Sequence, residues 1–183
     1  LDAPILAAPR SGWLYSTNGA PWSSTDPASD MRPQDYPLAA PFIETYITNR
    51  GYRAVEMLSP LARISDQQLL DAKFDLTSSE RSRTMEMVNI ILATESANDA
   101  ELAEIQALLR GWDRRAANDS PAAALVGMTF QPLYNATREG RPLPDPVDMA
   151  RQAAARLREH FGRIDPPLGD VLRLRRGAID QPL

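Results

Sequence analysis

Prolines crowd the beginning of this sequence and decide what that part of the chain cannot be. Seven of the 16 prolines fall within residues 1–41, and they are Pro4, Pro9, Pro21, Pro27, Pro33, Pro37 and Pro41. Each proline fixes φ and removes a backbone donor, so this segment cannot form a regular helix or a central strand. The aromatic residues of the same segment are Trp13, Tyr15, Trp22 and Tyr36. Because a disordered tail rarely holds so many aromatic side chains, we expect an ordered, irregular arm with a short strand at 12–15.

Residues 42–162 carry repeated helix-start signals, each followed by apolar residues at three- and four-residue spacing. The signals are Ser65 with Gln68, Thr77 with Glu80, Asn98 with Glu101, Ser120 before Pro121, and Asp145 before Pro146. Such side chains cap free N–H groups at a helix start, a Glu or Gln three residues later completes a capping box, and proline is tolerated at the first helical position. Gly162 is the expected end of the last helix. The segment is therefore predicted to be a helical domain.

Residues 163–183 form a third part of the predicted organisation. Pro166 and Pro167 stop the preceding helix, and Val171, Leu172 and Leu174 resemble a short strand. The predicted fold class is mainly α: a helical, bundle-like body with an irregular proline-rich N-terminal arm and a short C-terminal strand segment.

Composition excludes several classes of function. The net charge is −4, with 20 basic and 24 acidic residues, which argues against a protein that binds nucleic-acid phosphates. The local basic run at 173–176 is read as a solvated strand face in preference to a nucleic-acid patch. The sequence has no cysteine, so disulfides, thiolate catalysis and Cys-ligated zinc are excluded. No apolar run approaches the roughly 20 residues of a membrane helix, and we expect no membrane span.

The side chains do not spell out a known catalytic motif. The single histidine, His160, falls near the end of the last predicted helix, where interaction with the helix dipole is the favoured role. One histidine cannot form a histidine metal cluster. The sequence also lacks a glycine-rich phosphate loop. Motifs alone indicate a helical domain without an assigned function.

Three stretches spread over nearly the whole chain carry a further signal. They are SGWLYSTNGAP at 11–21; NRGYRAVEML at 49–58 with ISDQQL at 64–69; and GWDRR at 111–115 with Ser120, followed by LGDVLRLRRG at 168–177. In this order they resemble the penicillin amidase family, which includes acyl-homoserine lactone acylases. The resemblance implies that this chain is an internal fragment of the larger (beta) chain of an α+β N-terminal-nucleophile hydrolase.

The resemblance also implies a chemistry. In such enzymes a precursor is cut into two chains, and the Ser that opens the larger chain attacks an amide carbonyl, with its own α-amino group as the base. A backbone N–H and an Asn side chain then stabilise the oxyanion. The expected reaction is cleavage of the amide bond of an acylated small molecule, of the β-lactam or acyl-homoserine lactone type.

Three residues of this chain take roles by that resemblance. Asn18 corresponds to the oxyanion-hole Asn; the alternative is a turn residue, since Asn-Gly pairs are common in tight turns. Arg53 corresponds to an arginine that shapes the active site, and the alternative is a helix-surface arginine. Asp30 resembles a Ca²⁺ ligand of some members, and an ion there would need further oxygen ligands from outside this chain. No cofactor is required for the reaction.

The sequence departs from the family pattern in ways that set the remaining expectations. Leu1 is not a nucleophile, no stretch resembles the nucleophile-bearing junction, and the glycine-rich strand expected after Leu183 is missing. We therefore expect the chain alone to be inactive and to self-associate. Its expected partners are the small chain, the rest of the large chain and the acylated substrate, in the bacterial periplasm. The alternative is a non-catalytic helical binding or scaffold module that docks through Trp13, Tyr15 and Trp22.

Overall fold

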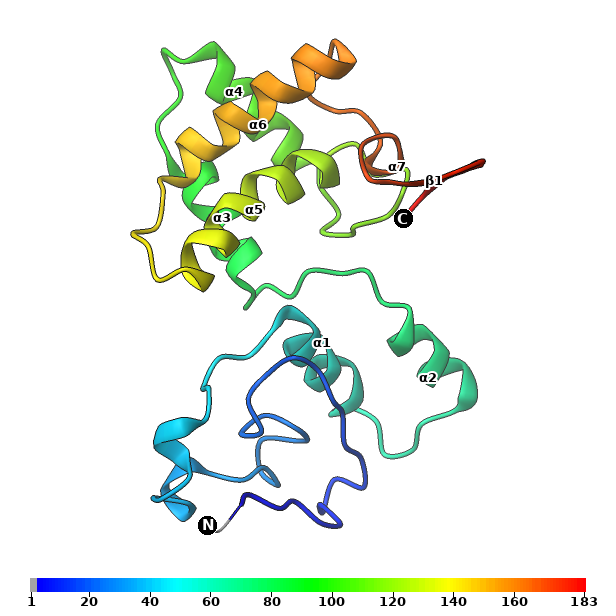
Figure 1. Ribbon diagram of the computed structural model, residues 1–183. Helices are drawn as coiled ribbons and strands as arrows, with labels where there is room; N and C mark the ends of the chain where they lie inside the picture. The colour runs from blue at the N-terminus through cyan, green and yellow to red at the C-terminus, as the bar shows by residue number, and fades with distance from the viewer. Residues whose placement is uncertain (1–2) are drawn as a thin grey trace. The chain divides into compact units, whose positions relative to one another are not determined.

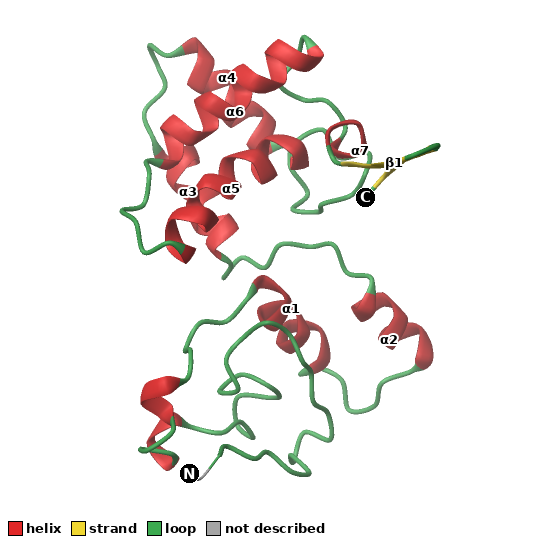
Figure 2. Cartoon of the chain, in the orientation of Figure 1, coloured by secondary structure: helices red, strands yellow, loops and turns green. Residues whose placement is uncertain are grey.

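The computed structural model describes residues 3–183, and the chain divides into two compact units, Leu1–Asp75 and Leu76–Leu183. Leu1, on which the expectation of a missing nucleophile was based, lies outside the described residues. The boundary between the units falls within 42–162, the segment interpreted from the sequence as one helical domain. The secondary structure is mainly helical with one short two-stranded sheet (Figures 1 and 2), which confirms the predicted fold class.

The first unit begins as an irregular arm, as its prolines predict. Before the first α-helix, the described residues form two 3-10 turns, η1 (Pro33–Asp35) and η2 (Ala40–Phe42), and Figure 2 shows loops around them. The short strand predicted at 12–15 is not formed. The carbonyl of Trp13 accepts from the side-chain hydroxyls of Thr25 at 2.7 Å and Ser11 at 3.2 Å, so side chains take the place of a partner strand at this residue.

Two helices complete the first unit: α1 (Asn49–Leu58) and α2 (Asp66–Lys73). Thr48 caps α1, because its hydroxyl accepts a hydrogen bond from the Gly51 N–H at 3.2 Å. The capping box predicted for α2 is confirmed: Ser65 Oγ accepts from the Gln68 N–H and the Gln68 side chain accepts from the Ser65 N–H. Both caps use only nearby atoms; the Ser65 signal produces a helix at the expected place, whereas the Thr48 cap was not among the predicted signals.

The second unit is built around four helices, α3 (Arg83–Ala93), α4 (Ala100–Arg110), α5 (Ala123–Arg138) and α6 (Pro146–Phe161) (Figure 1). They share one apolar core, whose most fully buried large side chains include Met87, Ile91, Leu102, Ile105, Leu125 and Leu157. These residues come from all four helices and recur at three- to four-residue spacing, so the predicted apolar stripes face one another. Burial of this surface is the main source of stability for the unit.

The helix starts differ in part from the predictions. Helix α6 begins after Asp145 and ends at Gly162, which has a φ of 72°, as predicted. Helix α3 is capped by Ser82 instead of Thr77, since Thr77 forms an antiparallel bridge with Arg115. That pairing holds Thr77 in an extended conformation, and the helix starts only after the chain leaves it.

Two further helices start one or more residues away from their predicted positions. Asp99, and not its neighbour Asn98, caps α4 by accepting from the Leu102 N–H at 3.0 Å. Helix α5 starts at Ala123, later than the Ser120 signal implies, although Ser120 Oγ still accepts from the Ala123 N–H at 3.3 Å. A charged carboxylate is the better partner for the positive helix end, which favours Asp99 over the neutral amide of Asn98.

The C-terminal part contains a single helical turn, α7 (Leu168–Val171), and an antiparallel hairpin of β1 (Arg173–Arg176) and β2 (Ile179–Pro182). The predicted strand therefore exists, but Val171 and Leu172 precede it. Arg173 Nε donates to Asp180 Oδ1 across the hairpin at 2.6 Å, so a carboxylate of β2 balances part of the basic run. This arrangement fits the solvated strand face preferred from the sequence.

Candidate active site

The loop around Asn18 lies against the start of α1, although about thirty residues separate the two segments. The N–H of Ala20 donates to the Tyr46 carbonyl at 3.1 Å. The hydroxyl of Thr48 donates to that of Thr17 at 3.2 Å. These two contacts bracket Asn18, so its position relative to the first turn of α1 is fixed from both sides.

Asn18 is paired with Arg50, the second residue of α1. Arg50 Nη2 donates a hydrogen bond to Asn18 Oδ1. The guanidinium therefore occupies the amide oxygen, and the N–H donors of Asn18 Nδ2 are the part of the side chain that can bind another acceptor. Both residues are exposed in this structure. The pair presents an amide donor, supported by a fixed cation, at the surface of the unit.

The backbone angles of Asn18 and Gly19 are relevant to the alternative that Asn18 is a turn residue. The tight hairpin turn typical of an Asn-Gly pair needs positive φ angles at its central residues. Neither Asn18 nor Gly19 has a positive φ. The pair therefore does not form the turn that would explain Asn18 by local geometry alone.

Tyr15 and Gly51 form the packed contact beneath this pair. A Cβ added to Gly51 would lie 2.9 Å from Ile47 Cγ2 and 3.2 Å from Tyr15 Oη. Tyr15 Oη is hydrogen-bonded to Ser23 Oγ at 2.6 Å, and burial raises the pKa of the Tyr15 hydroxyl. The loop and the helix thus meet without spare room.

Arg53, the arginine chosen from the sequence, has other partners. Its guanidinium binds Asp75 through Nε and Nη2, at 2.8 and 3.2 Å, and Glu56 through Nη1, at 2.8 Å. Hydrogen bonding to Asp75, followed in effect by Glu56, raises the pKa of Arg53 against the opposing effect of burial. The structure brings Asn18 together with Arg50, and Arg53 together with Asp75.

Sequence reasoning missed Arg50, although the stretch NRGYRAVEML contains both arginines. One signal could have found it: Arg50 is in the first turn of its helix, a position that carries little benefit for a cation because the helix dipole is positive there. An arginine at the unfavourable end of a helix therefore indicates a partner outside that helix. That partner is Asn18.

Asp30 is engaged by the backbone of its own loop. Its Oδ1 accepts hydrogen bonds from the N–H groups of Ser24 and Thr25, at 2.8 and 3.1 Å. Burial raises the pKa of the Asp30 carboxyl despite these two bonds, which act in the other direction. Within residues 3–183, no group of three or more His, Cys, Asp or Glu residues is placed to hold a metal ion. The assignment of Asp30 as a calcium ligand stays a prediction.

The aromatic residues of the arm contact one another. The rings of Trp13 and Tyr15 stack with centroids 6.3 Å apart, and those of Trp22 and Tyr36 are tilted at 5.9 Å. All four side chains are partly buried within their own unit. These contacts account for the aromatic content of the arm through its own packing, and no external partner is needed to explain it.

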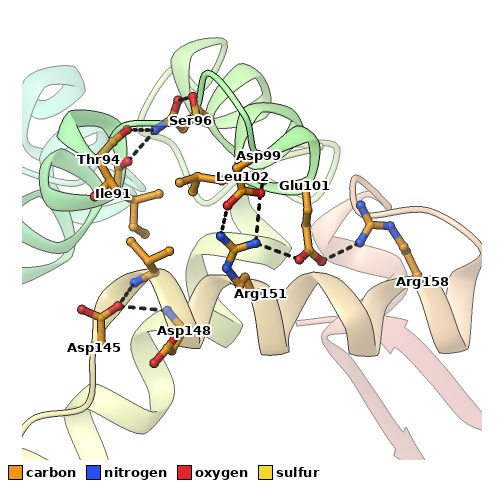
Figure 3. Close-up of polar contacts among 12 residues, drawn as sticks. Ile91, Thr94, Ser96, Asp99, Glu101, Leu102, Asp145, Asp148, Arg151 and Arg158 are labelled. Carbon is orange, nitrogen blue, oxygen red and sulfur yellow. Dashed lines mark hydrogen bonds and ion pairs between the residues drawn. The ribbon is translucent and has the colours of Figure 1, made fainter.

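The second unit contains a polar network of a different kind (Figure 3). Arg151 of α6 binds Asp99 and Glu101 at the start of α4, and Arg158, about two helical turns further along α6, also binds Glu101. Arg158 also reaches Glu104. Every charge in this row has an opposite charge beside it, so the network joins α4 to α6 and offers no unpaired group for catalysis.

A shallow hollow of 460 Å³ lies between the end of α4 and the start of α5. Leu108, Trp112 and Pro121 contribute to its wall, together with Asp113 and Asp119. The residues predicted from the sequence to be functional do not line it. His160, in the last turn of α6, is also separate from it.

Taken together, these features define a mainly helical protein whose irregular first unit displays an arginine-supported amide donor, a group suited to stabilising an oxyanion. The chain matches the penicillin amidase family over residues 2–176, and it belongs to this family. Membership supports an amidohydrolase-like family for this chain. In the described part of the chain, no helix is both long and apolar enough to cross a membrane.

Proposed function

We propose that this chain supplies Asn18 as an oxyanion donor in an enzyme that cleaves the amide bond of an acylated small molecule, of the β-lactam or acyl-homoserine lactone type. The observation that carries the proposal is the hydrogen bond from Arg50 Nη2 to Asn18 Oδ1. It supports the proposal because Arg50 holds the amide oxygen, so the Nδ2 donors of Asn18 remain available for a substrate oxygen. Membership of the penicillin amidase family supports the reaction class.

The chemistry follows from where charge develops. When a nucleophile attacks the amide carbon, the carbonyl oxygen becomes an oxyanion, and a preorganised donor aimed at it lowers the barrier. Arg50 polarises the Asn18 amide by binding its oxygen, which makes the Nδ2 hydrogens better donors. The first turn of α1 adds the positive end of a helix dipole on the same side. These groups act on the transition state more strongly than on the neutral substrate.

The attacking group of the proposed reaction lies elsewhere in the parent enzyme. We place it at the N-terminal Ser of the larger chain, whose α-amino group titrates near neutrality and can accept the hydroxyl proton. The partners of this chain are then the small chain and the rest of the large chain. The bacterial periplasm is the proposed location. The 183 residues alone are expected to be inactive, which an amidase assay of the isolated chain tests directly.

Arg53 and Asp30 receive supporting roles in this proposal. Arg53 shapes the site indirectly, because it holds α1, and with it Arg50, to Asp75. Asp30 orders the loop at 24–30, and a structural calcium ion in the intact enzyme would use it with ligands from other segments. Unfolding of the intact enzyme with calcium or a chelator tests this; a calcium-dependent shift that survives Asp30→Ala would exclude Asp30 as a ligand.

Replacement of Asn18 in the intact, processed enzyme tests the proposal. Asn18→Ala should lower kcat by about a hundredfold, the typical cost of removing one oxyanion donor. The folded enzyme should retain its KM and melting temperature, because Asn18 is exposed and its loop is held by Ala20 and Thr17. Unchanged turnover in a correctly processed Asn18→Ala enzyme would refute the assignment.

A further inference from the structure

We infer that Gly51 and Tyr15 are positioning residues that set the distance between Asn18 and Arg50; this inference rests on the proposed function. Gly51 directly follows Arg50 in α1, and Tyr15 precedes Asn18 by three residues in the loop. The contact between them therefore joins the two segments that carry the functional pair. A change in the distance between Tyr15 and Gly51 would therefore displace Asn18 and Arg50, because only a short stretch of backbone separates each from its neighbour in the contact.

The lack of space for a side chain, and not an unusual backbone conformation, explains why residue 51 is a glycine. Gly51 lies in the first turn of α1, where φ is not positive, so a residue with a side chain could adopt the same backbone angles. Glycine is a poor helix former and lowers the stability of a helix compared with alanine. Its presence at this buried position fits the close approach of Tyr15 and Ile47, because an added methyl group has no room between them.

Neither neighbour can easily give way. The Ile47 atom nearest the added Cβ, at 2.9 Å, is the branched methyl Cγ2, which moves little without moving the backbone. Tyr15 Oη, at 3.2 Å, is held by Ser23 Oγ, and the Tyr15 ring is stacked on Trp13. An alanine at position 51 would therefore push α1 and the loop apart. The donors that link Arg50 to Asn18 would lose their alignment.

Gly51→Ala in the intact enzyme should lower kcat by about tenfold with little change in KM, because small displacements of a catalytic group carry large costs in rate. Gly127→Ala is the matched control. Gly127 lies inside α5, has no atoms within 4 Å of an added Cβ and has no positive φ. The control variant should keep its activity and be at least as stable as the parent.

A double-mutant cycle separates positioning from general damage. If Gly51 acts through Asn18, then Gly51→Ala should cost almost nothing in kcat once Asn18→Ala is present. An equal, additive loss in both backgrounds would overturn the inference and leave the oxyanion assignment intact. No loss from Asn18→Ala by itself would instead refute the proposed function, so the two failures are distinguishable.

Tyr15→Phe provides a second variant if Gly51→Ala cannot be recovered in folded form. It removes the Oη that is hydrogen-bonded to Ser23 and that would lie 3.2 Å from a Cβ at position 51, and it keeps the ring. We expect a fall in kcat of about threefold that disappears in the Asn18→Ala background. Wild-type kcat in a folded Tyr15→Phe enzyme, or a loss that persists without Asn18, would overturn the inference.

Discussion

Arg53 binds both carboxylate oxygens of Asp75, with Nε 2.8 Å from Oδ2 and Nη2 3.2 Å from Oδ1. The pair connects α1 to Asp75, two residues beyond the end of α2. It therefore joins the two ends of the segment that contains α2. Both side chains are mostly shielded, with 22% and 15% of their surfaces exposed. Planar, two-point pairing of this kind is a property of arginine that lysine cannot reproduce.

Arg53→Met should therefore destabilise the first unit by about 2 kcal/mol, since it leaves the Asp75 carboxylate without its charged partner. The double variant with Asp75→Asn should lose less than the sum of the single variants, with a coupling of about 1 kcal/mol. Arg32→Met, at an exposed pair with Asp35, is the control and should cost less than about 0.5 kcal/mol. Urea unfolding measures all four; equal losses at the two sites would contradict the account.

Arg50→Met should reduce kcat by about tenfold, because Asn18 remains but loses the cation that orients and polarises its amide. Arg50→Lys should recover only part of the activity, as a lysine ammonium cannot keep the planar geometry of the guanidinium. Steady-state kinetics of the intact enzyme measures both variants. Full activity in a folded Arg50→Met enzyme would show that Asn18 needs no support from α1.

Buried Gln106 should be one of the most sensitive residues of the second unit. Its Nε2 donates to the carbonyls of Ile91 and Thr94, both at 2.8 Å, and its Oε1 accepts from Ser96. Gln106→Leu would remove both hydrogen bonds that Gln106 donates to the end of α3 and leave the Thr94 carbonyl without this donor, at an expected cost of about 3 kcal/mol. Gln131→Ala, on the exposed face of α5, should change the unfolding free energy by less than about 0.5 kcal/mol.

Asp99 gives the second unit a predictable acid sensitivity. Its pKa is lowered, first by hydrogen bonding to Arg151 and then by the Leu102 N–H. A carboxyl with a lowered folded-state pKa contributes stability above its unfolded value, and that contribution is lost as the pH falls through the folded value. The melting-temperature difference between the parent and Asp99→Asn should thus be constant near neutrality and shrink below about pH 4. A difference that grows on acidification would contradict this assignment.

Local signals predicted much of the fold. Ser65 with Gln68, and Asp145 with Gly162, mark helix ends correctly because each uses only atoms within one or two turns. Thr77 was misassigned because its fate depends on Arg115, a residue far along the chain, with which it forms a bridge. The residues next to Thr77 could not show that it would pair with Arg115 and not cap a helix.

The candidate site was harder to predict for the same reason. Asn18 could be chosen by its resemblance to a family position, but its partner could not, since two arginines stand three residues apart on the same helix. Which of them reaches Asn18 depends on how the loop lies against α1, and that is fixed by contacts such as Thr17 with Thr48. The resemblance gave Arg53 an active-site-shaping role and named no partner for Asn18; the structure places Arg50 beside Asn18.

The most direct test compares a tetrahedral phosphonate analogue of an amide substrate with the amine product, which carries no acyl oxygen. If Asn18 binds the oxyanion, Asn18→Ala should weaken the analogue by about a hundredfold and the amine product by less than about twofold. The loss of analogue affinity should match the loss in kcat/KM. Equal affinity of parent and variant enzymes for the phosphonate would contradict the central claim that Asn18 stabilises the oxyanion.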